Sequence, residues 1–478
     1  MTIPDSVTEI DDDAFSQCSN LSNVILSKGL TSLGYDVFYD CDALTSIAIP
    51  KSLESCHSFY TSHGPFKNCS NLKNVSFESG TTEIVNNLFY GCDGLEQITI
   101  PDTVKTIKSH AFELCSGLNS VKIPDSVTSI ENDAFADCTS LKTITIPNSV
   151  ESMGTDIFSG CSSLESATLP NTLTSLGNYA FKGCEALTDI HFGTGLKSIG
   201  TETFMDCASL QKVMLPYSIE SIGSNAFKND TKLTEIYIPV RTSSINATAF
   251  SYPKKMTIYG IEGSYAQEFA KEKDIAFVIS EAKPKKITLS ATEVSVDKNK
   301  TTQLFVTIAP AEYMGDVEWI SSDETIATVD KYGKVTAKSG GTTTITCTAG
   351  EVSTSAAIQV QVPVSKISLN KSHLDMEVGD TYELIATISP SEADSEELIY
   401  ESANTSIAAV DENGKITAVG EGETTITVKT PDGTVESSCT VTVTKPTLEF
   451  KMGDVNRDGK ISASDALKIL EYAAGLIN

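Results

Sequence analysis

The C-terminal stretch holds the residues whose types and spacing point most directly to chemistry. Its loop positions 1, 3, 5, 7, 9 and 12 are Asp454, Asn456, Asp458, Lys460, Ser462 and Asp465. The set offers side-chain oxygens, the Lys460 carbonyl and a glycine, Gly459, at the sharp turn, which is what a hard cation of Ca²⁺ size requires. The spacing therefore predicts a Ca²⁺ site, in which Ser462 binds directly or through water and Asp465 is a bidentate ligand.

A helix is expected to position the end of this loop. Residues Ala466 to Leu476 have apolar side chains on two sides of a predicted helix, and no helix signal precedes the loop. Together with Asp465 at the position where Glu closes an ordinary EF-hand, these features resemble one half of a type I dockerin. The resemblance implies a partial dockerin at 453–478, with Ca²⁺ as cofactor and a cohesin domain of a scaffold protein as partner. Dockerins use two such copies, so the apolar helix is expected to need a partner.

Most of the chain is organised by a repeat of 23 residues. Leu141 to Pro147 shows its pattern, in which apolar β-branched residues alternate with polar ones before a proline, and this predicts a short strand with one buried face. Periods of this length indicate a solenoid in which each coil buries its apolar positions against its neighbours. Phenylalanine marks the coils, with one irregular step, at Phe15, Phe38, Phe66, Phe89, Phe112, Phe135, Phe158, Phe181, Phe204, Phe227 and Phe250.

The repeated run L-x-x-I-x-I-P-x-x-V-x-x-I-x-x-x-A-F-x-x-C resembles the BspA-like, or treponemal, class of leucine-rich repeat. The resemblance covers residues 1–280 and implies a right-handed solenoid with a parallel sheet on one face. It also implies a secreted or surface-exposed bacterial protein that binds other proteins or cell surfaces. Within the same segment, Ser264 and Gln267 form a capping box that predicts a C-terminal helical cap. Met1 to Pro4 match the end of a repeat strand, so we expect the chain to begin in mid-repeat.

Two polar positions flank the middle residue of each repeat strand and form a lane along the sheet. Over the earlier coils these residues are mostly small and neutral, as at Thr143 and Thr145. In the last coils charged, aromatic and methionine side chains replace them, a composition typical of protein-binding surfaces. The alternative is that surface residues near the end of a solenoid simply vary and that the change in composition has no functional meaning. The predicted ligand-binding patch consists of Asp189, His191, Lys212, Met214, Tyr217, Glu235 and Tyr237.

The twelve cysteines do not indicate a disulfide framework. Nine of them recur once per coil, three residues after the phenylalanine, where a small apolar side chain is needed. Parallel side chains on neighbouring coils do not give the torsion that a disulfide requires. The sequence therefore predicts free, buried thiols.

A second and longer repeat follows the solenoid. Trp319 aligns with Tyr400 and Gly333 with Gly414, both at a step of 81 residues, and each copy alternates short strand patterns with turn signals. This predicts two β-sandwiches. The signature A-x-V-D-x-x-G-x-[VI]-T-A, followed by G-x-T-T-I-T, resembles the bacterial immunoglobulin-like domain of group 2, which implies extracellular spacer or adhesion modules at 283–362 and 363–446.

The net charge and the absence of catalytic motifs in the sequence argue against several classes of function. The 63 acidic and 35 basic residues give a formal net charge of −28, which argues against nucleic acid and anionic membranes as partners. The sequence shows no signal peptide and no apolar run of the length that membrane insertion needs. Neither a G-x-S-x-G, an H-E-x-x-H nor a phosphate-loop pattern occurs, so no enzyme is predicted.

The combined expectation is an extracellular bacterial binding or adhesion protein. The repeat face would bind a protein or polysaccharide ligand, and the dockerin would attach the chain to a cohesin scaffold through Ca²⁺. The alternative is a structural spacer or scaffold subunit of a cellulosome-like complex that binds no external ligand.

Overall fold

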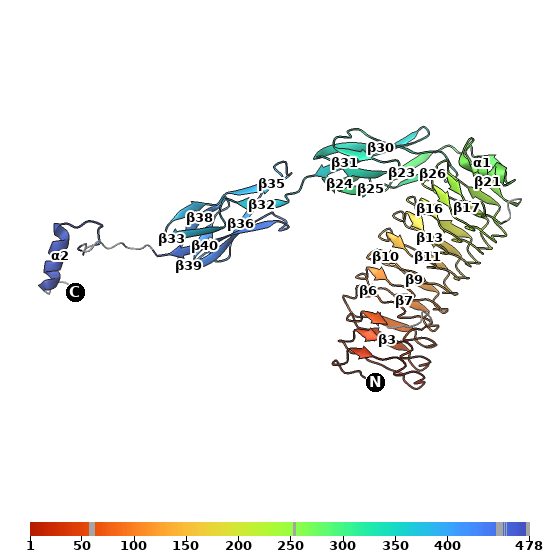
Figure 1. Cartoon of the computed structure of the whole chain (residues 1–478), viewed down its shortest axis with the longest axis horizontal. Coiled ribbons are helices and arrows are strands. Elements are labelled where there is room, and N and C mark those ends of the chain that lie inside the picture. The colour runs from red at the N-terminus through yellow and green to blue at the C-terminus, as the bar shows by residue number, and fades with distance from the viewer. Residues whose placement is uncertain (57–62, 252–254, 446–452, 454, 456, 475–478) are drawn as a thin grey trace. The chain divides into compact units, whose positions relative to one another are not determined.

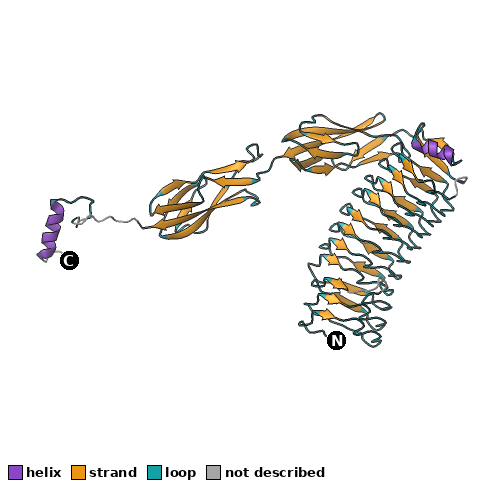
Figure 2. Cartoon of the chain, viewed as in Figure 1, coloured by secondary structure: helices purple, strands orange, loops and turns teal. Residues whose placement is uncertain are grey.

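The computed structural model describes residues 1–56, 63–251, 255–445, 453, 455 and 457–474, arranged in two compact units (Figure 1). The first unit contains the solenoid and most of the first β-sandwich, as Met1–Val294, Thr301–Thr336 and Thr343–Ile358. The second unit contains Ser295–Lys300, Ala337–Thr342 and Gln359–Asn478. The fold class predicted from the sequence is confirmed: a parallel β-solenoid is followed by two β-sandwiches and a C-terminal helix (Figure 2).

Longer strands form one face of the solenoid, which we call the strand face. Their central residues point inward and the flanking residues outward, as the exposed–buried–exposed pattern of Gln97–Thr99 shows. Neighbouring strands pair in parallel at equivalent repeat positions, for example Thr143 with Ser166 and Ser166 with Asp189. The strands of this face are β3 (Ser46–Ile49), β5 (Asn74–Phe77), β7 (Gln97–Thr99), β9 (Ser120–Lys122), β11 (Thr143–Thr145), β13 (Ser166–Thr168), β15 (Asp189–His191), β17 (Lys212–Met214), β19 (Glu235–Tyr237), β21 (Thr257–Gly260) and β22 (Ala276–Ile279).

Two-residue strands form a second set of parallel ladders, one strand per coil, after the turn that follows each long strand. Most of them place a polar residue outward and an apolar residue in the core. They are β1 (Glu9–Ile10), β2 (Ser32–Leu33), β4 (Ser55–Cys56), β6 (Glu83–Ile84), β8 (Thr106–Ile107), β10 (Ser129–Ile130), β12 (Ser152–Met153), β14 (Ser175–Leu176), β16 (Ser198–Ile199), β18 (Ser221–Ile222) and β20 (Ser244–Ile245).

The repeated phenylalanines form one continuous stack through the solenoid core. Neighbouring rings are nearly parallel, with centroids 5.2 Å apart at Phe112–Phe135 and 5.9 Å apart at Phe66–Phe89. These separations lie within the range of favourable offset stacking. Two residues in the left-handed region flank the ring in most coils, such as Asp133 and Asp137 around Phe135. Asp, Asn and Gly adopt this conformation at low cost, which explains their frequency at these two positions.

The cysteines of the repeat are free, and those from Cys41 to Cys207 are buried, as predicted from their spacing; Cys18 in the first coil is exposed. The thiol of Cys138 donates a hydrogen bond to the carbonyl oxygen of Phe112 at 3.2 Å, and Cys161 makes the same bond to Phe135. Cysteine therefore does more than fill space: its weak S–H donor satisfies a backbone acceptor of the coil before.

Helix α1 (Tyr265–Glu272) covers the last coil of the solenoid. Its Ala266, Phe269 and Ala270 are buried, and the Phe269 ring meets Phe250 edge-on at 6.1 Å. The predicted cap is present, because the Ser264 hydroxyl accepts the Gln267 N–H. The reciprocal bond differs slightly from prediction: the Gln267 side chain accepts the N–H of Gly263, one residue earlier.

Each β-sandwich has nine strands in the same order. The larger sheets run β24-β31-β30-β27 and β33-β40-β39-β36, with smaller sheets beside them. The first sandwich consists of β23 (Lys286–Leu289), β24 (Glu293–Asp297), β25 (Thr301–Gln303), β26 (Val306–Ala309), β27 (Glu318–Ser321), β28 (Ala327–Val329), β29 (Lys334–Ala337), β30 (Gly341–Ala349) and β31 (Val352–Gln361). The second consists of β32 (Lys366–Leu369), β33 (His373–Glu377), β34 (Thr381–Glu383), β35 (Ala386–Ser389), β36 (Ile399–Ser402), β37 (Ala408–Val410), β38 (Lys415–Ala418), β39 (Gly422–Lys429) and β40 (Glu436–Thr444).

Helix α2 (Ala463–Ala473) is the last element that the structure describes. Among the described residues, no helix combines the length and the hydropathy that crossing a lipid bilayer requires.

One acidic residue interrupts the cysteine ladder and should make the stability of the solenoid depend on pH. Asp230 is 3% exposed, and burial raises the pKa of its carboxyl group from 3.8 to about 9. Between these values the folded state binds the proton more tightly than the unfolded state, so stability falls as pH rises, by up to ~1.4 kcal/mol per unit. Asp230→Cys restores the ladder residue. Urea unfolding should show a flatter pH dependence for this variant; parallel profiles for both proteins would contradict the assignment.

Thiol labelling tests the burial of the cysteine ladder. Burial raises the pKa of Cys161 to about 12, so its reactive thiolate is scarce at neutral pH. Mass spectrometry of the native chain after a short iodoacetamide treatment should therefore find modification at Cys18 and none at the eleven buried cysteines. All twelve should react in urea, and rapid native labelling of any ladder cysteine from Cys41 to Cys207 would contradict the packing.

Candidate ligand face and calcium loop

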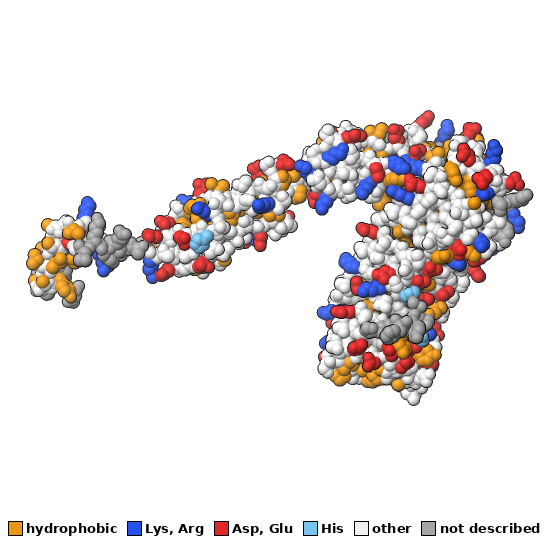
Figure 3. Space-filling model, in the orientation of Figure 1, with side chains coloured by type: hydrophobic (Ala, Val, Ile, Leu, Met, Phe, Trp, Pro, Cys, Tyr) orange, Lys and Arg blue, Asp and Glu red, His pale blue; other side chains and the backbone are white. Residues whose placement is uncertain are grey.

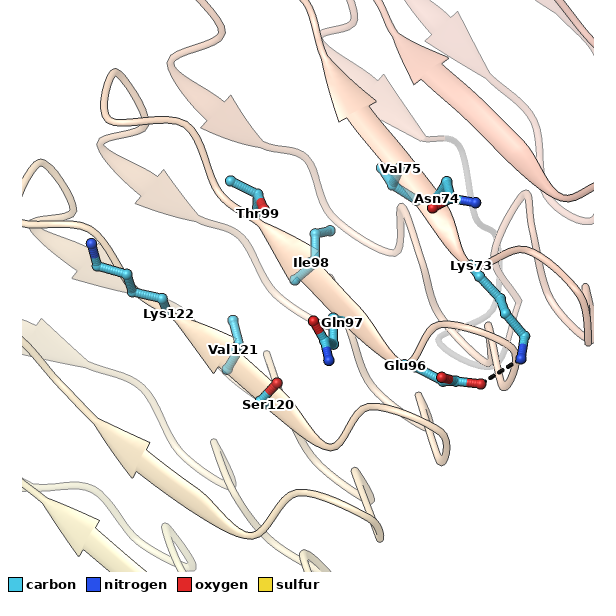
Figure 4. Close-up of a pocket in the computed structure, with 10 residues that line it drawn as sticks. All are labelled: Lys73, Asn74, Val75, Glu96, Gln97, Ile98, Thr99, Ser120, Val121 and Lys122. Carbon is cyan, nitrogen blue, oxygen red and sulfur yellow. Dashed lines mark hydrogen bonds and ion pairs between the residues drawn. The ribbon is translucent and has the colours of Figure 1, made fainter.

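The strand face exposes a lane of mostly uncharged polar side chains across several coils, with Lys122 on β9 as a charged exception. Figure 4 shows Gln97 and Thr99 on β7 between Asn74 on β5 and the residues of β9, with the Lys73–Glu96 ion pair at one end. In the described structure the side chains of Gln97, Thr99, Ser120, Thr143 and Thr145 make no hydrogen bond to protein groups. Their donors and acceptors face outward at a repeat of about 4.8 Å, the spacing of paired strands.

Three adjoining hollows follow this lane along the solenoid. The one in Figure 4 measures about 610 Å³ and is lined by β5, β7 and β9. It shares Asn74 and Val75 with a hollow of about 570 Å³ toward the N-terminus. On its other side it shares Val121 and Lys122 with a hollow of about 670 Å³ that extends to His191. The three hollows share lining residues and therefore lie in a row along the strand face. We call this row the groove, and each hollow has the volume of a small-ligand site.

The predicted ligand patch lies at the C-terminal end of this lane, and its residues differ in exposure. Asp189 and His191 are exposed on β15, with the His191 Nδ1 3.4 Å from an Asp189 carboxylate oxygen. Lys212 is also exposed, although its ammonium group pairs with Glu312 of the first sandwich at 3.2 Å. Met214 and Glu235 are half-buried beside it.

The two aromatic members of the predicted patch are buried. Tyr217 is 7% exposed and Tyr237 is 8% exposed. The Tyr237 ring stacks on Tyr259 of the next coil at 4.4 Å, with the Lys212 ammonium group 4.7 Å from its centroid. Burial raises the pKa of Tyr217 well above its usual value. The outward surface of the patch therefore comes mainly from Asp189, His191 and Lys212.

Neutral residues of the earlier coils line the groove although they are not part of the ligand patch predicted from the sequence. Small polar residues are the ordinary solvent face of a strand, so the residue types of Gln97, Thr99, Ser120 and Thr145 give no signal of their own. The available signal was their persistence at the same two repeat positions, since the solenoid places equivalent residues side by side.

One cluster of the solenoid has the donor set of a metal site. His110, Glu113 and Asp133 bring ligand atoms within 4.8 Å of one another. The His110 Nδ1 lies 2.5 Å from a Glu113 oxygen and 3.8 Å from an Asp133 oxygen. The hydrogen bond to Glu113 raises the pKa of His110 against the effect of partial burial. An imidazolium ion paired with two carboxylates accounts for this geometry, and we assign no metal to it.

The predicted calcium loop is described in part, since Asp454 and Asn456 lie outside the described residues. Gly459 has φ of 79°, the left-handed conformation that the sharp turn at loop position 6 requires. Asp458 accepts the N–H of Lys460 at 3.0 Å through its Oδ1. The described candidate ligands, Asp458, Lys460, Ser462 and Asp465, offer oxygen atoms, which are the ligand type that a hard cation such as Ca²⁺ prefers.

Asp465 also has a structural role that the ligand pattern did not include. Its side chain is 1% exposed, and its Oδ2 accepts the backbone N–H of Ser462 at 2.9 Å. With the Ser462 hydroxyl this forms a capping box at the start of α2. The residue proposed to close the metal shell thus also fixes the first turn of the helix.

Apolar side chains gather on the surface of α2, where Figure 3 shows a concentration of hydrophobic residues. Leu467, Ile469, Leu470 and Tyr472 are between 50% and 69% exposed. In the described structure no element covers them, which agrees with the expectation that this helix needs a partner.

Comparison with known proteins identifies related segments. The chain is 31% identical over 199 residues to an uncharacterized protein of Clostridium acetobutylicum and 45% identical over 85 residues to another from the same organism. These matches take in 40% and 18% of this chain and 20% and 21% of the relatives, so the chain spans about a fifth of their length. An Ig-like virion protein of Serratia phage KSP90 is 32% identical over 138 residues, which are 27% of this chain and 52% of that protein.

Two solved structures resemble the solenoid. A leucine-rich repeat protein from Bacteroides ovatus is 27% identical, covering 58% of this chain and 76% of that one, with a TM-score of 0.45. A leucine rich cell surface protein from Faecalibacterium prausnitzii is 24% identical, covering 55% and 85%, with a TM-score of 0.31.

Family models account for the two architectures in turn. The bacterial Ig-like domain of group 2 matches residues 284–360 and 363–441, which are the two sandwiches. The BspA type leucine rich repeat region matches 1–63, 60–165 and 153–266, more than half of the chain. The chain therefore belongs to the BspA-type leucine-rich repeat family, and it carries two bacterial Ig-like domains of group 2 behind its repeats.

Proposed function

We propose that this protein is an extracellular, cell-surface-associated binding protein of a bacterium and that it acts in adhesion without catalysing a reaction. The observation that carries the proposal is the groove on the strand face, whose lining includes polar side chains such as Gln97, Thr99 and Thr145 that make no hydrogen bond to protein groups in the described structure. The printed name of the Faecalibacterium prausnitzii protein, a leucine rich cell surface protein, is consistent with this location.

The groove favours a ligand that is extended and largely uncharged. Gln97, Thr99, Ser120 and Thr143 supply amide and hydroxyl groups, whereas the chain as a whole has a net charge of −28. A polysaccharide or an extended protein segment offers complementary donors and acceptors at regular intervals. Asp189 and His191 would contact the same ligand at the far end of the groove.

The alternative function is a structural spacer or scaffold subunit with no external ligand. The two Ig-like domains favour it, since such modules can serve only to separate other parts of a surface assembly. Selective capture of a polysaccharide or host protein by the solenoid supports adhesion, while capture of a cohesin alone supports the spacer.

We further propose that the C-terminal segment is a partial dockerin that binds Ca²⁺ and attaches the chain to a cohesin domain, as part of a cellulosome-like complex. Support comes from the left-handed Gly459 and from Asp465, which is placed at the start of a helix with an uncovered apolar surface. Asp454, Asn456, Asp458, Lys460, Ser462 and Asp465 would hold the ion.

A bulky charged residue in the groove should abolish ligand capture. Thr145 is exposed on β11 in the middle of the lane, so Thr145→Arg obstructs the groove without entering the core. We expect this variant to lose binding to whichever neutral polysaccharide or extracellular protein the wild-type chain retains on an immobilised panel. Biolayer interferometry would measure the loss.

Thr128→Arg is the matched control, because Thr128 is also exposed but precedes the short strand β10, away from the strand face. It should bind like the wild type. Equal loss in both variants, or no retained ligand on the panel, would contradict a binding role for the groove.

Calcium titration tests the C-terminal loop. Asp458→Asn keeps an oxygen to accept the Lys460 N–H but removes one of the negative charges that favour a hard cation. Calorimetry should detect one Ca²⁺ site in the wild-type chain, a weaker site in this variant, and an unchanged site in Asp432→Asn, a turn residue of the second sandwich. A chain ending at Lys445 should lack the site, and heat that persists there would place calcium elsewhere.

A further inference from the structure

The last coils of the solenoid depart from the repeat at positions that face the first sandwich. The residue two places after the strand-ending proline, or its equivalent, is small in earlier coils: Thr103, Ser126, Ser149, Thr172, Gly195 and Ser218. At this position the next coil has Arg241. The preceding position, which is Asp or Asn in most of the earlier coils, becomes Tyr217 and then Val240.

The guanidinium group of Arg241 forms hydrogen bonds to the first sandwich. Its Nη1 donates to the Lys331 carbonyl at 2.6 Å and its Nη2 to the Val317 carbonyl at 2.7 Å, while Nε pairs with the Asp316 carboxylate. The Arg241 side chain is 9% exposed, whereas Asp316 is 64% exposed, so the guanidinium group is shielded although its ion pair lies at the surface. Hydrogen bonds in which one group is charged contribute more than neutral ones. Arg241 and its three partners all belong to the first compact unit.

Aromatic rings from both sides hold the guanidinium group in place. Its central carbon lies 5.6 Å from the Tyr217 ring of the solenoid and 5.5 Å from the Tyr332 ring of the sandwich. The Lys197 ammonium group also lies over Tyr332, 3.6 Å from its centroid. This arrangement explains why Tyr217 is buried although its coil position is polar elsewhere.

Further contacts surround this centre. The Val240 N–H donates to the Met314 carbonyl at 2.9 Å. The Ser280 hydroxyl donates to the Glu312 carbonyl at 2.8 Å, and the Glu312 carboxylate pairs with Lys212 at 3.2 Å. Lys331 pairs with Glu220 at 3.1 Å. Backbone, hydroxyl and charged groups of several coils thus engage one end of the sandwich.

The second sandwich shows that these features are specific to the first. Leu304 and Leu384 are equivalent, because their N–H groups donate to Gly333 and Gly414 at 2.9 Å. By this register Tyr332 corresponds to Asn413 and Lys331 to Glu412. Phe305, which approaches Gly195 of the solenoid, corresponds to Ile385, which is 53% exposed. At these three positions, therefore, only the first copy carries the contact side chains.

We propose that the end of the solenoid is a docking surface for the first sandwich of the same chain. The hydrogen bonds of Arg241 hold the two together as one rigid unit. The charged and aromatic character of the last coils then reflects this internal interface, and external ligands are left with the groove, which ends at His191. The proposal does not depend on which ligand that groove binds.

Hydrogen exchange at two neighbouring amides tests the docking. Val240 donates across the interface, whereas Ile238 donates to Tyr259 within the solenoid at 2.9 Å. In Arg241→Gln, we expect exchange at Val240 to accelerate by about tenfold or more, given the usual worth of charged hydrogen bonds, with Ile238 still protected. Arg241→Lys should behave similarly, because an ammonium group cannot replace the guanidinium fork.

A second readout uses Trp319, the one tryptophan of the chain, which lies in the first sandwich. Its fluorescence transition in urea should coincide with the loss of solenoid circular dichroism in the wild type. The Trp319 transition should separate and move to lower urea in Arg241→Gln. Lys73→Gln, which breaks an exposed ion pair elsewhere on the solenoid, should leave both measurements unchanged.

Two results would overturn the proposal. The first is wild-type exchange at Val240 together with a wild-type Trp319 transition in Arg241→Gln. The second is loss of protection at both Val240 and Ile238, which would mean that Arg241 supports the fold of the solenoid itself.

Discussion

The return of the backbone to the same place after 23 residues is the constraint on which the solenoid depends. Each coil must offer its strand N–H and carbonyl groups to the next coil about 4.8 Å away. Like residues therefore lie over like residues, and phenylalanine stacks with centroids 5.2 to 5.9 Å apart. Cysteine suits its position because a small thiol fills the core and donates to the carbonyl of the coil before. Asp230 breaks this rule, and its orphaned carboxylate oxygen shows what the ladder excludes.

The same constraint creates the proposed binding surface. Residues that face outward at one repeat position become neighbours on the strand face. Small polar side chains of different coils, such as Gln97 and Thr145, therefore line the groove together. The proposed binding site therefore spans several coils. A surface of this kind can change its ligand by substitution at outward positions while the inward positions keep the fold.

A terminal coil of a solenoid has a neighbouring coil on one side only, so its core residues are exposed unless another element covers them. At the C-terminal end, α1 packs Phe269 against the last phenylalanine of the stack, and Arg241 engages the first sandwich beside it. Helix α2 also exposes apolar side chains. Its Leu470 and Tyr472 are not covered by any element in the described structure. Its proposed partner, a cohesin, would cover a surface that is open in the described part of the chain.

The sequence by itself determined the solenoid, the buried ladder of thiols and the two sandwiches, because periodic patterns are local and repeat many times. It also indicated the capping box at Ser264. Two matters were decided by tertiary structure. Tyr217 and Tyr237 have the composition of a binding patch, but their burial depends on Arg241, Tyr259 and the first sandwich, which are remote in sequence or follow no repeat. Asp465 has the spacing of a metal ligand, and only the folded turn shows that its carboxylate also caps a helix. The sequence repeat predicts which side chains a coil buries against its neighbouring coils. It does not predict which side chains another domain covers, because that contact is made between segments that share no sequence pattern.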